Sequence, residues 1–475
     1  CVLDKNSRSP LHMAQSLHQK CAVVDGQTAF VGGVDLTVER SGDFDRWDVS
    51  SHAFELPVRA TDKGDSPHPW HDVHVLVTGA PAGDVEQNIR QRWDESDHSP
   101  FRRRWRATTP PLRHLAARFV TGGVRSVRHA MRREEAGHLP PGAGSSIDGP
   151  QARVQILRTI PALTYRFAPA GIHDIVQAYI LAARRAERFI YLESQYLWLE
   201  GYHGVDMLSL GWQSHYMQPL FEAMAQAAER GVAVAVVLPD HPNCGRAYTC
   251  DGIAWLREHA PSAAQAGRLN FYTLAASDGA PGAARYRPIY VHAKVAIVDD
   301  RWATVGSANL NSRGMSHDAE LNIAALDDAF ARGLRLTLWS EHLGTQVGVN
   351  TGWPAPAALP LPHPLATPEP RGPLALLRPI EVPTPPRDSS PDARDAADLA
   401  GIDDPLGGLD LLAHAAQDNL DRLRRRDPLV GQLFPFLCPD EGPDLGLTVD
   451  RERGVLDPLR VEREGIAIQH SGKYM

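Results

Sequence analysis

Cysteine and lysine are scarce in this 475-residue chain, and it contains no long apolar run. The five cysteines are an odd number, and none belongs to a Cys-x-x-Cys or Cys/His set with the spacing of a zinc site. Cys244 and Cys250 either pair in an oxidising compartment or remain two free thiols in a loop. Because no uninterrupted stretch reaches about 18 apolar residues, no membrane-spanning helix is expected.

The charge balance is acidic, with 49 basic and 57 acidic residues and a net charge of −8. This balance argues against a general nucleic-acid binder, which usually carries a basic footprint. Ten arginines nevertheless gather between residues 101 and 133. They could face anionic lipid headgroups or nucleic-acid phosphates, or they could be the solvated side of a helix.

The few lysines make one repeated pattern informative. Only five of the 49 basic residues are lysines, yet two of them lie in copies of His-x-Lys-x-x-x-x-Asp. The first copy is His18, Lys20 and Asp25, and the second is His292, Lys294 and Asp299. Roughly 0.01–0.02 chance matches would be expected in a chain of this composition. Each copy continues through a short turn into a second apolar segment and a Gly-Gly or Gly-Ser pair, which indicates an internal duplication.

Both motifs are expected on strands. Around His292 and Lys294, apolar and polar residues alternate and valine and isoleucine are frequent, as in a pleated conformation. Two residues that lie two apart on a strand point to the same face, so the histidine and lysine of each copy can reach one ligand.

The second half of the chain alternates expected helices and strands. Residues 171–188 and 218–231 have helical spacing, and a glycine ends the second segment. Residues 188–198 are expected to form a buried strand, and residues 232–240 are apolar on both faces, as in a central strand that is covered on both sides. This alternation predicts an α/β fold with layered helices.

The duplicated motif resembles that of the phospholipase D superfamily, and further segments extend the similarity over roughly residues 10–347. Residues 178–198 look like the helix and strand of that family that end in a Glu-x-Gln-Tyr signature. Residues 46–52 and 69–93 resemble stretches of its phospholipid-cleaving branch, and residues 338–344 resemble the end of its second half.

The resemblance implies a duplicated α/β/α sandwich whose two halves pack about a pseudo-twofold axis. We expect a first half in residues 1–100, an arginine-rich segment and linker in 101–150, and a second half in 151–347. Residues 348–475 are expected to be a proline-rich linker and C-terminal extension. The family's first half has further strands and a helix before the first motif, which predicts that this chain lacks its natural start.

Two histidines and two lysines at one centre supply what phosphodiester cleavage requires. One imidazole attacks phosphorus and gives a phosphohistidine, while the other protonates the leaving oxygen. The resemblance implies that His18 is the nucleophile and His292 the general acid and base. Lys20 and Lys294 are expected to bind the non-bridging oxygens, with Ser307 and Asn309 as neutral donors. No metal or cofactor is expected.

Each catalytic histidine needs a carboxylate that fixes its tautomer. The resemblance implies Glu320 for His292, and Asp48 is the corresponding candidate for His18. Asp25 and Asp299 are expected at the far ends of the motif strands, where they bond backbone or a basic group. In the first half Asp35 follows the glycine pair where an asparagine donor is expected, so the role of this residue is left open.

The leading hypothesis is a phospholipase D-type hydrolase that forms phosphatidic acid and an alcohol, with headgroup exchange when an alcohol replaces water. The alternatives are a nuclease of the same superfamily, a cardiolipin synthase-like phosphatidyl transferase, and an inactive scaffold that binds anionic lipid. The expected partner is phospholipid at a membrane surface rather than nucleic acid, and the expected state is a monomer. A cytoplasmic or peripheral-membrane location is expected, and secretion stays open as an alternative.

Overall fold

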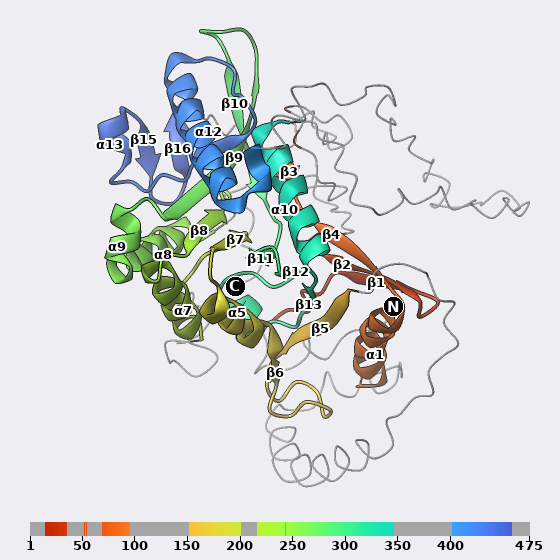
Figure 1. Cartoon of the computed structure of the whole chain (residues 1–475). Helices are drawn as coiled ribbons and strands as arrows, with labels where there is room; N and C mark the ends of the chain where they lie inside the picture. The colour runs from red at the N-terminus through yellow and green to blue at the C-terminus, as the bar shows by residue number, and fades with distance from the viewer. Residues whose placement is uncertain are drawn as a thin grey trace, which may run out of the picture.

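The computed structural model describes residues 15–35, 52, 54, 69–95, 152–200, 216–242, 244–345 and 401–457 (Figure 1). Asp48 and the arginine-rich segment between residues 101 and 133 lie outside these ranges, as do residues 348–400. Among the described helices, none combines the length and the apolar character that crossing a bilayer requires. The four cysteines that the structure describes are free thiols, and Cys244 and Cys250 are among them.

A large mixed sheet of 11 strands forms the centre of the second half. In spatial order it contains β3 (Trp70–His71), β10 (Arg285–Val291), β9 (Leu269–Asp278), β8 (Ala233–Val237), β7 (Phe189–Glu193), β11 (Val295–Val298), β12 (Trp302–Gly306), β13 (Glu320–Leu326), β5 (Arg153–Ile160) and β6 (Ile172–His173), while β14 (Leu433–Pro435) pairs with β9. Strands β7, β8 and β9 are parallel, and the strands from β7 through β11, β12 and β13 to β5 are antiparallel.

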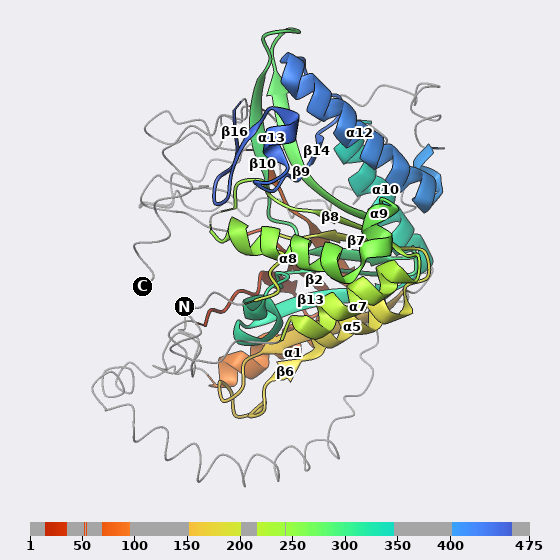
Figure 2. The same cartoon turned by 90° about the vertical axis from the view of Figure 1, so that its left-hand side faces the viewer.

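Helices cover both faces of this sheet, as Figures 1 and 2 show. One layer consists of α5 (Asp174–Arg185), α7 (Gln218–Glu229), α8 (Arg246–His259) and α9 (Pro261–Gln265), and the other of α10 (Asp328–Leu343) and α12 (Pro405–Arg425). Strand β7 explains the two layers, because Ile190 and Leu192 enter the core beneath α5 and α7 while Tyr191 enters the core of Trp339 on α10. The expected α/β fold with layered helices is confirmed.

A smaller sheet belongs to the first half. It consists of β1 (Cys21–Val24), β2 (Thr28–Gly32) and β4 (His74–Thr78), followed by α1 (Ala80–Glu95). Val31 and Val77 of this sheet share one hydrophobic cluster with Leu321 and Ile323 of β13. The two halves are therefore joined by a common apolar core.

The duplication is visible in the order of the elements. Strands β1, β2 and β4 and helix α1 repeat the succession of β11, β12, β13 and α10, with antiparallel pairing throughout. Both hairpins turn through a motif aspartate in the left-handed region, with φ of 54° at Asp25 and 56° at Asp299. Aspartate tolerates this conformation better than most residues. The expected duplication of the fold is confirmed.

The C-terminal part folds back onto the second half. Helix α12 lies in the expected C-terminal extension, and α13 (Gly442–Leu445), β15 (Thr448–Asp450) and β16 (Gly454–Asp457) follow it. Arg335 of α10 is fully buried and donates to both carboxylate oxygens of Asp300 at 2.7 Å and to the Ile402 carbonyl at 2.6 Å. Helix α12 thus packs in the helical cover of the large sheet, while β14 adds a strand to that sheet.

Candidate active site

His18 and His292 are each bound to a carboxylate from the opposite half of the chain. His18 Nδ1 lies 2.9 Å from Glu320 Oε1, and the His18 backbone N–H donates to the Ala319 carbonyl at 3.0 Å. His292 Nδ1 lies 2.7 Å from Asp72 Oδ2. The two motifs therefore meet in one site, and each half supplies the carboxylate for the other half's histidine.

This crossed arrangement corrects the expected pairing. Glu320 binds His18 and not His292, because the start of β13 runs beside the segment that carries the first motif. The carboxylate that contacts His292 is that of Asp72, which lies in the family-like segment of residues 69–93 but is not among the residues predicted from the sequence. Asp48, the expected partner of His18, lies outside the described residues.

Sheet register shows that Asp72 and Glu320 occupy equivalent positions. Gly32 pairs with His74 across β2 and β4, and Gly306 pairs with Asn322 across β12 and β13. Each carboxylate stands two residues before the partner of that glycine. An alignment of the two repeats would therefore have predicted Asp72, because each repeat has an acidic residue at or just before the start of its third strand.

The contacts of His18 select one tautomer. Its Nδ1 faces the Glu320 carboxylate and, at 3.1 Å, the backbone carbonyl of Ser307, and both groups accept hydrogen bonds. Nδ1 therefore carries the proton. Nε2 of the neutral ring then holds a lone pair, which is the form that a nucleophile requires.

Burial and the two motif lysines lower the pKa of both catalytic histidines. Burial, Lys20 and Lys294 together lower the pKa of His18 to about 3. Burial and the same two ammonium groups lower the pKa of His292 well below its usual value. Each histidine thus feels the lysine of the opposite motif as well as its own, so the four groups form one electrostatic unit.

We expect the acidic limb of kcat/KM to lie well below pH 6.5. A lowered pKa keeps His18 neutral, and hence nucleophilic, as the pH falls from 6.5 toward about 3. An ordinary histidine would be only about 3% neutral at about pH 5. A pH–rate profile in buffers of constant ionic strength checks this, and an acidic limb centred at or above pH 6.5 contradicts it.

The two lysines are held in the same way. Lys20 Nζ donates to the His18 carbonyl at 2.9 Å, and Lys294 Nζ donates to the His292 carbonyl. Lys20 also lies 3.4 Å from the Asp35 carboxylate, which gives Asp35 a contact in the first half. The histidine and lysine of each motif were expected on a strand, and this expectation is wrong. Strands β1 and β11 begin directly after the two lysines, so both residues of each motif precede their strand.

Ser307 and Asn309 occupy different positions relative to the site. The Ser307 hydroxyl donates to Glu320 Oε2 at 2.5 Å, so its proton is engaged by the orienting acid and is not offered to a phosphate. The Asn309 amide donates to Gln195 Oε1 at 3.1 Å and keeps a second N–H. Gly33 stands in the place of Ser307 in the first half, where a Cβ would come within 2.0 Å of Asp72 Oδ1.

The motif aspartates lie away from the histidines, at the far strand ends where they were expected. Asp25 is exposed in the turn after β1. Asp299 accepts backbone N–H groups of residues 187, 188 and 189 at 2.8, 2.9 and 2.8 Å, which fixes the start of β7. The contacts of Asp299 are those of a structural residue.

Glu193, the acid of the Glu-x-Gln-Tyr segment, lies at the centre of a buried network. Its carboxylate accepts from His71 Nε2 at 2.7 Å, from His342 Nε2 at 2.9 Å and from the Tyr191 hydroxyl at 2.6 Å. Burial alone lowers the pKa of His71, but the Glu193 carboxylate outweighs it and raises that pKa to about 9. Glu193 thereby anchors the segment that carries Asp72, the neighbour of His71.

Replacing Glu193 by glutamine should destabilise the protein by about 3 kcal/mol, since removing one partner leaves a buried charge uncompensated. Urea unfolding of wild type and Glu193→Gln measures the difference. Glu222→Gln, on the exposed side of α7, is the matched control and should change the unfolding free energy by less than about 0.5 kcal/mol. Equal losses in both variants would show that the network contributes no stability.

Two family models match the chain. The model for "Phospholipase D" matches residues 5–118, and the model for "Cardiolipin synthase, PLD-like domain" matches residues 206–339. Phospholipase D alpha 4 of Arabidopsis thaliana is 26% identical over 417 residues, which cover 73% of this chain and 51% of that protein. Phospholipase D alpha 2 of Oryza sativa is 28% identical over 69% of this chain and 48% of that protein. The chain spans about half the length of these curated relatives.

Solved structures with detectable similarity share little identity with the chain. A phosphatidylserine synthase of Haemophilus influenzae is 16% identical with a TM-score of 0.38, and the match covers 67% of this chain and 60% of that one. Nuc of Salmonella typhimurium, described as a phospholipase D family member, is 15% identical with a TM-score of 0.25 and covers 39% and 90%. The family models and relatives agree with the repeated motif: the chain belongs to the phospholipase D superfamily.

Proposed function

We propose that this protein is a phosphodiesterase that hydrolyses phospholipids through a phosphohistidine on His18. The observation that carries the proposal is the crossed pair of histidine–carboxylate contacts, which brings both motifs to one site. In the proposed monomer the two halves of one chain complete the site.

The proposed reaction has two displacements. His18 Nε2 attacks phosphorus, and the bond from phosphorus to the headgroup oxygen breaks. His292, whose protonated form the bound phosphate anion would stabilise, gives its Nε2 proton to that oxygen. His292 then removes a proton from water, the water oxygen attacks phosphorus, and the bond to His18 breaks. Phosphatidic acid leaves, and an alcohol in place of water would give headgroup exchange. Lys20, Lys294 and the Asn309 amide would stabilise the charge on the phosphoryl oxygens.

Phospholipid is the preferred substrate class because the names of the curated relatives are those of phospholipases D. The match to a cardiolipin synthase-type model keeps a phosphatidyl transferase as the second candidate. A superfamily nuclease and an inactive lipid-binding scaffold are the remaining alternatives. The paired motifs and their buried lysines support an active enzyme over a scaffold.

One set of assays separates these activities. The protein is incubated in EDTA with phosphatidylcholine vesicles, with phosphatidylglycerol vesicles and with single-stranded DNA. Choline release with phosphatidic acid as product is the expected result. Cardiolipin formation from phosphatidylglycerol would favour the transferase, and cut DNA without lipid turnover would replace the proposal by a nuclease. Vesicle binding without any product would favour the scaffold.

A further inference from the structure

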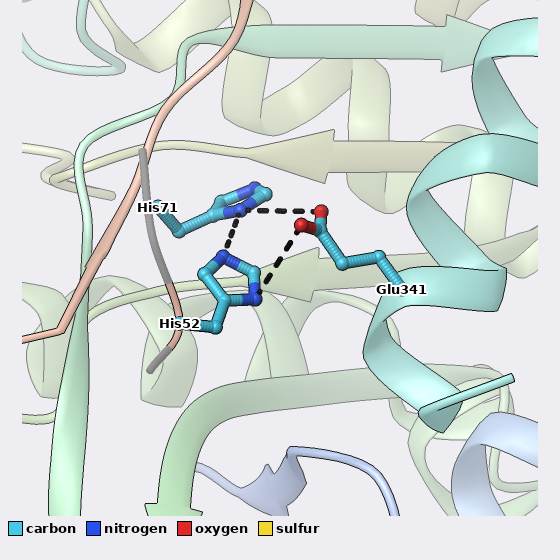
Figure 3. A group of neighbouring side chains, drawn as sticks. All are labelled: His52, His71 and Glu341. Atoms are coloured by element: carbon cyan, nitrogen blue, oxygen red, sulfur yellow. Dashed lines mark hydrogen bonds and ion pairs between the residues drawn. The ribbon is translucent and has the colours of Figure 1, made fainter. Parts of the chain in front are cut away.

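Two histidines and a glutamate from separate parts of the chain form a cluster beside the site (Figure 3). His52 Nε2 lies 2.8 Å from His71 Nδ1. Glu341 reaches them from α10, with Oε2 at 3.7 Å from His71 Nδ1 and Oε1 at 3.6 Å from His52 Nδ1. This His52–His71–Glu341 cluster takes no part in the proposed reaction.

The outer nitrogen of each ring is committed to an acceptor. His71 Nε2 donates to the Glu193 carboxylate at 2.7 Å, and His52 Nδ1 donates to Gln432 Oε1 at 2.6 Å. The two remaining ring nitrogens, His71 Nδ1 and His52 Nε2, face one another at 2.8 Å. The raised pKa of His71 puts a proton on its Nδ1, and this proton is donated to the lone pair of His52 Nε2. A metal ion that binds both nitrogens would take the place of that proton.

We propose that His52, His71 and Glu341 form a binding site for a divalent cation of the zinc class. Zinc lies about 2.0–2.1 Å from imidazole nitrogen, so a tetrahedral ion holds two such nitrogens about 3.3 Å apart. The two rings would have to separate by roughly 0.5 Å to meet that geometry. Glu341 Oε2 already lies 3.7 Å from the ligand nitrogen His71 Nδ1. The 3.6 Å contact of Glu341 Oε1 is with the outer nitrogen of His52, so the carboxylate would turn toward His52 Nε2 to complete the site.

The surroundings also suit a metal. Ligating histidines usually donate their other ring N–H to a carboxylate or carbonyl oxygen, as both rings do here. The Glu341 side chain is 41% exposed, so an ion can enter from solvent and a water molecule can complete its shell. Two imidazoles favour zinc and its transition-metal neighbours over magnesium and calcium, which prefer oxygen donors.

A bound ion would join three parts of the molecule. His52 and His71 belong to the first half, Glu341 lies on α10, and Gln432 is held beside the helix because its backbone N–H donates to the His342 carbonyl at 2.8 Å. Because none of the ligands is a catalytic group, turnover in EDTA should continue. The proposed site is therefore independent of the proposed function.

The test uses the full chain, loaded with Zn²⁺ and then freed of unbound metal by gel filtration. Elemental analysis should find about one zinc per chain, and zinc should raise the Tm of the wild type because it binds the folded state. The Glu341→Gln variant changes a partly exposed side chain, so it should fold and should bind zinc at least about tenfold more weakly. Co²⁺ should give the visible bands of a tetrahedral site in the wild type alone.

Two control variants keep the cluster intact. Glu222→Gln and His414→Gln replace exposed residues on α7 and α12 and should hold zinc as the wild type does. The proposal is overturned if the wild type holds no more zinc than the His52→Gln/Glu341→Gln double variant, or if zinc leaves its Tm unchanged. The occupant is then a proton shared by the two rings. If circular dichroism shows that Glu341→Gln is unfolded, His52→Gln alone decides.

Discussion

The His292→Ala variant should release about one equivalent of p-nitrophenol per chain from phosphatidyl-p-nitrophenol and then stop. This leaving group departs as a stable anion, so the first displacement needs no proton from His292. The second displacement still needs a base to activate water, and without one the phosphohistidine accumulates. Stopped-flow absorbance measures the burst, and the acid-labile phosphate should map to the peptide that contains His18.

His18→Ala should give no burst with the same substrate, because the attacking nitrogen is missing. Steady-state turnover of phosphatidylcholine should fall by at least about a thousandfold in both variants. His414→Ala, an exposed histidine on α12 that contacts only the Asp410 carbonyl among the bonds described, should behave as the wild type. A burst in His18→Ala and none in His292→Ala would reverse the two roles.

Loss of either orienting carboxylate should lower kcat by about 10²–10⁴, although neither group contacts the phosphate. Glu320→Gln removes the carboxyl group that contacts Nδ1 of His18, and Asp72→Asn does the same for His292. The p-nitrophenol substrate distinguishes the two variants. Asp72→Asn should recover the first displacement, since only the acid is impaired, whereas Glu320→Gln should stay slow because the nucleophile is impaired.

The crossed pairing of carboxylates and histidines determines which of the two variants recovers activity with the p-nitrophenol substrate. If Glu320 served His292, as the family resemblance had implied, recovery would be seen in Glu320→Gln instead. Asp25→Asn supplies the comparison with a motif acid, because Asp25 is exposed in a turn whose left-handed backbone asparagine also tolerates. Its kcat should stay within about twofold of the wild type.

The catalytic histidines could be predicted from the sequence, but the carboxylate that contacts each of them could not. Scarcity of lysine and the repeated spacing identified His18 and His292 without any structure. Their carboxylates lie 302 and 220 residues away along the chain, and no local pattern states which sheet edge will face which segment. Only the strand register that forms on folding makes Asp72 and Glu320 equivalent.

Tertiary contacts also explain the other differences. The role of Glu193 depends on His71 and His342, which come from segments far from its own strand. The glycine at position 33 looks like a departure from the repeat, but a side chain there would collide with Asp72. The helix α12 was predictable from its amphipathic spacing, whereas its docking beside α10 follows from the buried Arg335.

The exchange of carboxylates between the halves makes them mutually dependent. A fragment that carries either repeat alone would keep its histidine and lysine, but that histidine would lose the group that orients it. A chain cut between the repeats could work only after both fragments had reassembled. Mutational drift in one repeat is likewise constrained by the chemistry of its twin, which gives selection a reason to keep both in a single polypeptide.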